Sequence, residues 1–134
     1  MNKNYELTLL VRPDISDEEV KMALQQLKDI IISNNGSVLY AEYWGLRKLE
    51  YKINKNDNAF FYMLQINSNK EINDLLEEKI NTSAIFIRHL LLNINKDEVK
   101  VKTANNLING NDLDDGIVFD RRYYNVIGNV FNLG

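Results

Sequence analysis

The segment Trp44–Lys55, WGLRKLEYKINK, combines the alternation of a β-strand with a high density of positive charge. Residues 38–53 are predicted to form one long extended strand, because apolar and charged side chains alternate over residues 48–53. Gly45 interrupts this strand and is expected to form a bulge or bend that redirects its later half. Turn-forming residues at 54–58 (NKNDN) and an apolar run at 59–66 (AFFYMLQI) then complete a predicted hairpin. This hairpin is the centre of the predicted fold.

Two strands and two helices flank the hairpin in the sequence. Residues 5–11 alternate between apolar and polar side chains, as a half-buried strand does, and residues 85–94 form a strongly apolar strand. The pattern S-x-x-E at 16–19 and at 68–71 is typical of the capping box that opens a helix, and apolar residues follow each box at helical spacing. Asn35–Gly36 predicts the end of the first helix.

The predicted order is strand, helix, strand, strand, helix, strand. Helices between strands require crossover connections, and a split βαβ arrangement satisfies both handedness and burial. The sequence therefore predicts an α+β protein, a ferredoxin-like βαββαβ sandwich with a four-stranded antiparallel sheet and two helices on one face. The other face of this sheet carries no helix and is expected to contact a partner.

The periodic pattern ends near residue 95, so residues 1–95 are predicted to form one binding domain. Residues 96–134 are rich in Asn, Asp and Gly and are predicted to form a flexible C-terminal tail. Within it, the apolar and aromatic residues of 117–133 (IVFDRRYYNVIGNVFNL) form either a loose end or a docking segment that orders on a partner.

The bulk composition excludes several classes of protein. The chain has 134 residues, a net charge of -3 and no cysteine, which excludes disulfides, zinc-thiolate sites and a cysteine nucleophile. It contains neither the apolar run of a signal peptide nor that of a membrane span, so a cytoplasmic protein without a membrane partner is predicted.

Catalytic chemistry is not indicated either. The loop after the first strand contains Pro13, which has no N–H to offer a phosphate. His89 is the single histidine and has no neighbour in the sequence that suggests a nucleophile or a second metal ligand. Paired acids such as Glu18–Glu19 and Glu77–Glu78 are ordinary solvated helix residues. We therefore expect no enzyme, no metal, no cofactor and no small-molecule substrate.

Binding chemistry is concentrated in the opening segment, where four cations and one acid give a local charge of +3. Those cations are Arg47, Lys48, Lys52 and Lys55, and the acid is Glu50. Nearby aromatic residues could stack on bases, although strand aromatics more often pack in a core. Core or cross-strand packing is the expectation for Tyr51, whereas both interpretations stay open for Trp44. Lysines that keep an edge strand soluble are the alternative interpretation of the cations.

The same segment resembles the signature of the bacterial small-subunit ribosomal protein six family, in which W-G-x-R-x-L-x-Y-x-I-x-K occupies the second strand. Every fixed position of the signature is met. Supporting matches are Tyr5–Glu6, Pro13–Asp14, Gly36 and the IRHLLL run that begins at Ile87. The resemblance covers about residues 3–95.

Membership of this family implies binding to the central domain of small-subunit rRNA together with ribosomal protein eighteen, in the ribosome. The resemblance transfers basic positions to Lys3, Arg47, Lys48 and Arg88. The complete set of candidate rRNA-binding residues is Lys3, Tyr5, Trp44, Arg47, Lys48, Lys52, Lys55 and Arg88. Two departures from the family pattern are Asn4, where a second basic residue is common, and Glu50, where alanine is common.

Two other functions fit the predicted fold. An RNA-recognition motif has the same order of elements but needs a Lys/Arg-Gly-aromatic octamer on its third strand. Residues 58–62 (NAFFY) supply the aromatics without the cation or the glycine. A small acylphosphatase-like hydrolase is disfavoured by the proline in the first loop.

Overall fold

The computed structural model describes residues 1–100 and 120–131. Its strands and α-helices are β1 (Lys3–Val11), α1 (Asp17–Ser33), β2 (Ser37–Ile53), β3 (Asn56–Ser68), α2 (Lys70–Thr82), β4 (Phe86–Asn93) and α3 (Arg121–Phe131), with a 3₁₀ turn at Lys96–Glu98. No helix in these two ranges is long and apolar enough to cross a membrane.

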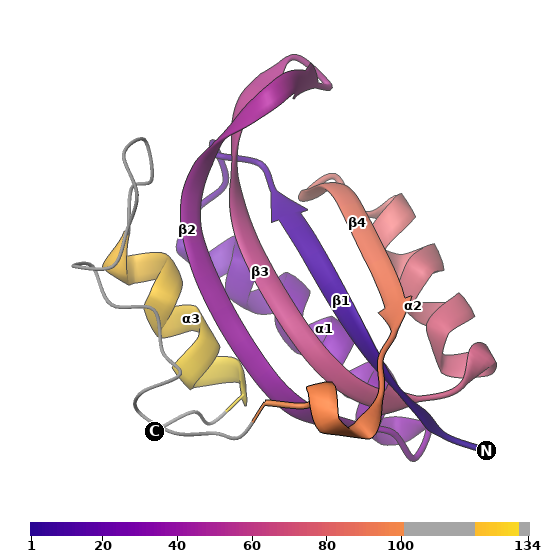
Figure 1. Cartoon of the computed structure of the whole chain (residues 1–134). Coiled ribbons are helices and arrows are strands. Elements are labelled where there is room, and N and C mark those ends of the chain that lie inside the picture. The colour runs from indigo at the N-terminus through magenta and orange to yellow at the C-terminus, as the bar shows by residue number, and fades with distance from the viewer. Residues whose placement is uncertain (101–119, 132–134) are drawn as a thin grey trace.

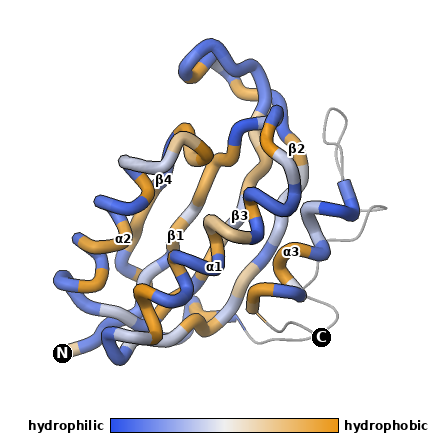
Figure 2. Tube along the Cα trace, turned by 180° about the vertical axis from the view of Figure 1, so that it is seen from behind, coloured by the Kyte–Doolittle hydropathy of each residue, from blue (hydrophilic) through white to orange (hydrophobic). Residues whose placement is uncertain are grey.

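The four strands form one antiparallel sheet in the order β2-β3-β1-β4. Helices α1 and α2 cover one face of it (Figure 1), and α3 lies beside α1 at the β2 edge of the same helical layer (Figure 2). The predicted ferredoxin-like sandwich with a four-stranded antiparallel sheet is confirmed. The third helix adds to the two that were predicted.

The core lies between the sheet and this helical layer. Alternation along the strands puts Leu7 and Leu9 of β1 on the same side as Tyr62 and Leu64 of β3, and all four are essentially inaccessible to solvent. Helix α1 meets them with Val20, Leu24, Leu27 and Ile31. Each such side chain contributes about 1.5–3 kcal/mol through its burial, so this face fixes the register of every strand.

The two helix starts are not capped alike. Ser16 accepts a hydrogen bond from the Glu19 N–H at 3.2 Å, as predicted. The second cap is Asn69 rather than the predicted Ser68, and its side chain accepts from Ile72 N–H at 3.0 Å. Ser68 still belongs to β3, where it is paired with Lys3, so it cannot serve as the residue that begins the helix.

The β2–β3 hairpin is longer than predicted and its turn is shorter. Gly45 has φ 89° at an irregularity in the pairing of β2 with β3, which confirms the predicted bulge. Ile53 pairs with Asn56, and the two residues between them, Asn54 and Lys55, have φ 48° and 68°. Positive φ at both central positions is the mark of a type I′ turn. The end of the hairpin projects beyond the sheet (Figure 1).

The residues directly after β4 cross the face of the sheet that carries no helix. They are held by Gln65 of β3, whose side chain is 1% exposed. Its carbonyl accepts from Lys100 N–H at 2.7 Å, and its NH₂ donates to the Glu98 carbonyl at 3.1 Å and to Glu6 at 3.3 Å. One end of this face is therefore covered by the chain itself.

Helix α3 packs on α1 and on the β2 edge. Tyr123 stacks on Phe60 with ring centroids 3.9 Å apart, and its carbonyl accepts from the Tyr62 hydroxyl at 2.8 Å. Lys28 of α1 donates to the Val130 carbonyl at 2.7 Å, which places a cation at the C-terminal end of α3. Helix α3 lies within 117–133, the segment expected to be either a loose end or one that orders on a partner, and here it packs on its own chain. The domain boundary at residue 95 stays a prediction, and residues 101–119 and 132–134 lie outside the described ranges.

Candidate nucleic-acid interface

The sheet face without helices carries the cluster that best fits a binding role. Residues paired directly across antiparallel strands point to the same face, so the register aligns Arg88 of β4, Leu10 of β1 and Phe61 of β3 in one row. Gly45 continues this row on β2. We call this side of the sheet the open face.

Arg47 and Trp44 meet on the open face because the bulge at Gly45 shifts the alternation of β2. The Arg47 guanidinium lies 5.3 Å from the centroid of the Trp44 ring and 5.7 Å from that of Phe61. Its Nε–H donates to the Trp44 carbonyl at 3.3 Å. Two aromatic rings therefore hold the guanidinium in place by cation–π attraction. In the part of the chain that the structure describes, Arg47 forms no ion pair, so its charge is available to an anion.

Glu42 organises the rest of this cluster. Its carboxylate accepts from Trp44 Nε1–H at 2.9 Å and from the Tyr40 hydroxyl at 2.8 Å, and it pairs with Lys100 Nζ at 3.1 Å. Burial first, and then the neighbouring carboxylate, raise the pKa of Tyr40, so that hydroxyl stays protonated, and therefore a donor, far above neutral pH. Because Lys100 neutralises Glu42, the negative charge beside Arg47 is compensated.

The structure brings some of the candidate residues together and separates others. Arg88 is exposed on the open face, in the row that contains Phe61. Lys48 is also exposed, but strand alternation places it on the same side as Leu46 and its partner Phe60, which is the helix side of the sheet. Trp44, Arg47 and Arg88 thus share one face, whereas Lys48 does not.

Lys52 and Lys55 lie on the projecting part of the hairpin, where Lys52 approaches Asp57 at 3.9 Å. This ion pair is weak, because both side chains are more than half exposed and the two charged atoms are far apart. Lys3 is exposed at the opposite end of the sheet. Lys3 precedes Leu10 by seven positions on β1, which corresponds to about 24 Å along a strand.

Two aromatic positions differ in their surroundings. Tyr5 is half-buried and packs against the core on the helix side, so its ring is not part of the open face. Tyr51 was expected to pack, and this expectation is wrong, because its side chain is 78% exposed. Beyond the pair Lys48–Asn58 the hairpin extends past the helical layer, so the Tyr51 ring has no core to pack against.

Sequence reasoning missed Phe61 and Glu42 as members of the cluster. Both lie on the open face, Phe61 in an apolar run that reads as core and Glu42 outside the cationic segment. The signal that could have identified them is the period of two combined with the bulge at Gly45, which requires the register of the hairpin to be known.

His89 contacts an acidic residue of the neighbouring helix. Its Nε2 lies 3.2 Å from a carboxylate oxygen of Glu77, which joins β4 to α2. Within residues 1–100 and 120–131, no group of three histidine, cysteine or acidic side chains could hold a metal ion.

The fold and the cluster together define a class, a ferredoxin-like domain whose open sheet face presents cations and aromatic rings. A family model described as "Ribosomal protein S6" matches residues 4–93, more than half of the chain. The chain belongs to the ribosomal protein S6 family of the small ribosomal subunit. This is a family of structural ribosomal proteins rather than of enzymes, and membership confirms the predicted location in the cytoplasmic ribosome.

Relatives and a solved structure agree with this assignment. The chain is 39% identical over 90 residues to small ribosomal subunit protein bS6 of Orientia tsutsugamushi (strain Ikeda), covering 67% of this chain and 76% of that one. It is 35% identical over 97 residues to bS6 of Aquifex aeolicus (strain VF5), covering 72% and 88%.

The crystal structure of 30S ribosomal protein S6 from Thermotoga maritima has the same fold. It superposes with a TM-score of 0.65 at 21% identity, covering 70% of this chain and 89% of that one. The family match ends at residue 93, so α3 lies outside it.

Proposed function

We propose that this chain binds the central domain of small-subunit rRNA jointly with ribosomal protein eighteen. The observation that carries the proposal is Arg47, a guanidinium without an ion pair among the described residues, held between Trp44 and Phe61 on the open face. Such a fixed, planar cation suits a phosphate oxygen or the face of an unpaired base.

The remaining candidate cations extend this contact. Arg88 is exposed on the open face, and Lys52 and Lys55 stand on the hairpin that projects at the same end of the sheet. Lys48 would contact RNA from the helix side of the same hairpin. Lys3, with Tyr5 beside it, would form a separate contact at the far end of the sheet.

Apolar side chains on the open face support a protein partner beside the RNA. Leu90 and Leu92 of β4 are 54% and 47% exposed, and the register places them on this face next to Thr8 and Glu6. An uncovered apolar strip on an otherwise packed sheet favours contact with another protein. Joint binding would explain how a chain of net charge -3 binds RNA, if the partner contributes further positive charge to the shared surface.

Binding of an rRNA central-domain fragment, with and without protein eighteen, tests the proposal. Arg47→Glu and Arg88→Glu should each weaken binding at least tenfold, because a phosphate contact is replaced by repulsion. Lys70→Glu makes the same charge change on α2, away from the open face, and should leave the affinity unchanged. Equal affinities for all four proteins, or no gain from protein eighteen, would contradict joint binding through this face.

The RNA-recognition-motif alternative receives less support. That mode stacks bases on exposed aromatics of the two central strands. Here the central strand β3 presents Phe61 beneath Arg47, followed by Met63 and Gln65, which are 1% exposed.

A further inference from the structure

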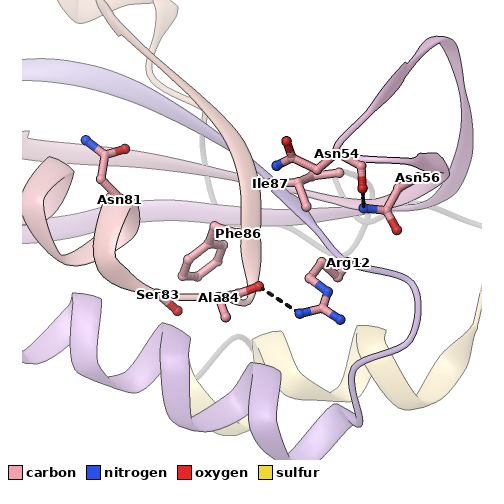
Figure 3. A pocket seen from close by; sticks show the side chains of 8 residues that line it. All are labelled: Arg12, Asn54, Asn56, Asn81, Ser83, Ala84, Phe86 and Ile87. Carbon is pink, nitrogen blue, oxygen red and sulfur yellow. Dashed lines mark hydrogen bonds between the residues drawn. The ribbon is translucent and has the colours of Figure 1, made fainter.

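A pocket of about 390 Å³ opens where the projecting hairpin meets the beginning of β4 (Figure 3). Three segments that are distant in the sequence form its wall, namely the residue after β1, the β2–β3 turn, and the end of α2 with its connection to β4. Its volume lies in the range of small-ligand sites.

The most distinctive groups in the wall are three asparagine amides, from Asn54, Asn56 and Asn81. In the described part of the chain, the side chains of Asn54 and Asn81 make no hydrogen bond. Asn56 uses only its NH₂, which donates to the carbonyls of Ile53 and Asn54 at 3.2 Å each. Two complete amides and one carbonyl oxygen are therefore left for a ligand. An amide presents a donor beside an acceptor, which matches the edge of a nucleobase.

The charge of the wall argues against a free anion as the ligand. Arg12 is its cation, and its Nε–H and Nη2–H donate to the two carboxylate oxygens of Asp14 at 3.1 and 2.8 Å. Nη1–H donates to the Ala84 carbonyl at 3.3 Å (Figure 3). The guanidinium is thus fixed and neutralised by Asp14. A pocket with polar walls and no net charge suits a neutral planar group better than a phosphate.

Two cations are neighbours in the chain of residues that line the pocket. Lys55 is positioned between Asn54 and Asn56 in the turn, Arg88 directly follows Ile87, and both side chains are exposed. A nucleotide whose base entered the pocket would have its neighbouring phosphates near these two side chains.

We propose that this pocket binds one unstacked nucleobase of a single-stranded RNA segment, with the flanking phosphates on Lys55 and Arg88. The proposal rests on the proposed rRNA binding and deepens it, because it adds base recognition to the phosphate contacts. Single-stranded bases are the usual targets when proteins read RNA sequence.

A titration of the isotope-labelled full chain with AMP, GMP, CMP and UMP, followed by NMR, tests the ligand class. The side-chain amide signals of Asn54 and Asn81 should shift with at least one nucleotide. Ribose 5-phosphate and inorganic phosphate carry the charge without the base and should not move them. Equal shifts with ribose 5-phosphate would overturn the proposal in favour of an anion site, and no shift with any nucleotide would overturn it as well.

Two variants test the pocket in the RNA complex. Asn54→Gly removes the amide while keeping a residue that accepts φ 48°, and Asn81→Ala suits the exposed end of α2. Each should weaken binding to the rRNA central-domain fragment about two- to tenfold, the loss expected for one or two neutral hydrogen bonds. Asn125→Ala, at an exposed position of α3, is the matched control and should bind as the unaltered chain does.

The two proposals fail in different ways. If the unaltered chain binds the fragment and both pocket variants bind equally well, base recognition here is wrong while rRNA binding stands. If the unaltered chain does not bind the fragment, the proposed function is wrong, and the nucleotide titration alone decides whether the pocket accepts a base.

Discussion

Asn35 and Gly36, at the end of α1, are constrained in different ways, Asn35 by backbone conformation and Gly36 by space. Asn35 has φ 67°, and its N–H donates to the Ile32 carbonyl at 3.2 Å, while Gly36 N–H donates to the Ile31 carbonyl at 2.8 Å. This is the Schellman arrangement, in which the left-handed residue is Asn35. A Cβ on Gly36 would lie 2.7 Å from the Asn67 carbonyl oxygen, so glycine is needed there for space.

Opposite effects on stability should follow from substituting these two residues. Asn35→Gly removes the strain of a left-handed side-chain-bearing residue and should raise the free energy of unfolding by up to about 1 kcal/mol. Gly36→Ala should lower it by about 1–3 kcal/mol, since backbone of β3 must move to admit the methyl group. Urea denaturation measures both, and an unchanged midpoint for Gly36→Ala would contradict the tight approach.

At the scale of elements, the conformations of the β2–β3 hairpin and of helix α3 depend both on local sequence and on tertiary contacts. The hairpin turn places a lysine, Lys55, at φ 68°, where glycine is strongly preferred. Helix α3 begins after Asp120, whose carboxylate accepts from Arg122 N–H at 3.0 Å and from its guanidinium at 2.8 Å. Each end of α3 thus has one side-chain partner, and at the C-terminal end it is Lys28.

Lys55→Gly should separate the stability of the hairpin from its function. Glycine completes the preferred Asn-Gly pair of a type I′ turn, so the free energy of unfolding should rise by about 0.5–1 kcal/mol. RNA affinity should fall at the same time, because one phosphate contact is lost. Thermal melts and RNA titration of the same sample measure the two effects, and a parallel change in both would count against a role for the ammonium group.

The stabilisation of α3 by the Asp120 carboxylate should depend on pH. The hydrogen bond from Arg122 holds the pKa of Asp120 below its usual range, so its contribution to stability is present above about pH 4 and is lost as the pH falls through the folded-state pKa. Asp120→Ala should weaken the docking of α3 by about 1 kcal/mol at neutral pH. Hydrogen exchange of the α3 amides measures this, with Asp120→Asn as the control that keeps a capping oxygen. A deficit of Asp120→Ala that is the same at pH 3 and pH 7 would exclude the charged cap.

At the scale of the whole molecule, charge is distributed unevenly over a chain whose sum is -3. Arg47, Arg88 and the hairpin lysines gather at one end of the sheet, while acids such as Asp17, Glu18 and Glu19 occupy the first turn of α1. Screening over about 8 Å makes the near charges decisive for a bound phosphate.

Salt dependence should therefore report a small number of contacts. If about four cations neutralise phosphates, log K should fall against log salt concentration with a slope of about -3 to -4. Arg47→Ala should reduce the magnitude of that slope by about 1. Equilibrium titrations over a range of salt concentrations measure it, and a slope near zero would exclude phosphate contacts as the source of affinity.

The parts of the fold that could be predicted from sequence are those set by local periodicity. Strand alternation, the capping box at Ser16 and the bulge at Gly45 all depend on neighbours in the chain. The environment of Tyr51 depends on where the helical layer ends, and that is a tertiary property. Helix α3 did leave a local signal, because Tyr123, Val126, Ile127, Val130 and Phe131 have the spacing of one helix face.

In the candidate site, too, some features follow from local sequence and others from tertiary structure. The residue types and the positions of Arg47 and Trp44 follow from the signature, whereas their contact with Phe61 requires the register of β2 on β3. The pocket joins residues from positions 12 to 87, so no short sequence pattern could have predicted it.

Trp44 is the single tryptophan of the chain, and its indole lies half-buried between Glu42 and Arg47. Its emission is therefore a built-in optical probe of the open face. A ligand that withdraws the guanidinium or stacks on the ring should change the intensity and wavelength of that emission without any label. Trp44 fluorescence can therefore report binding at the open face directly.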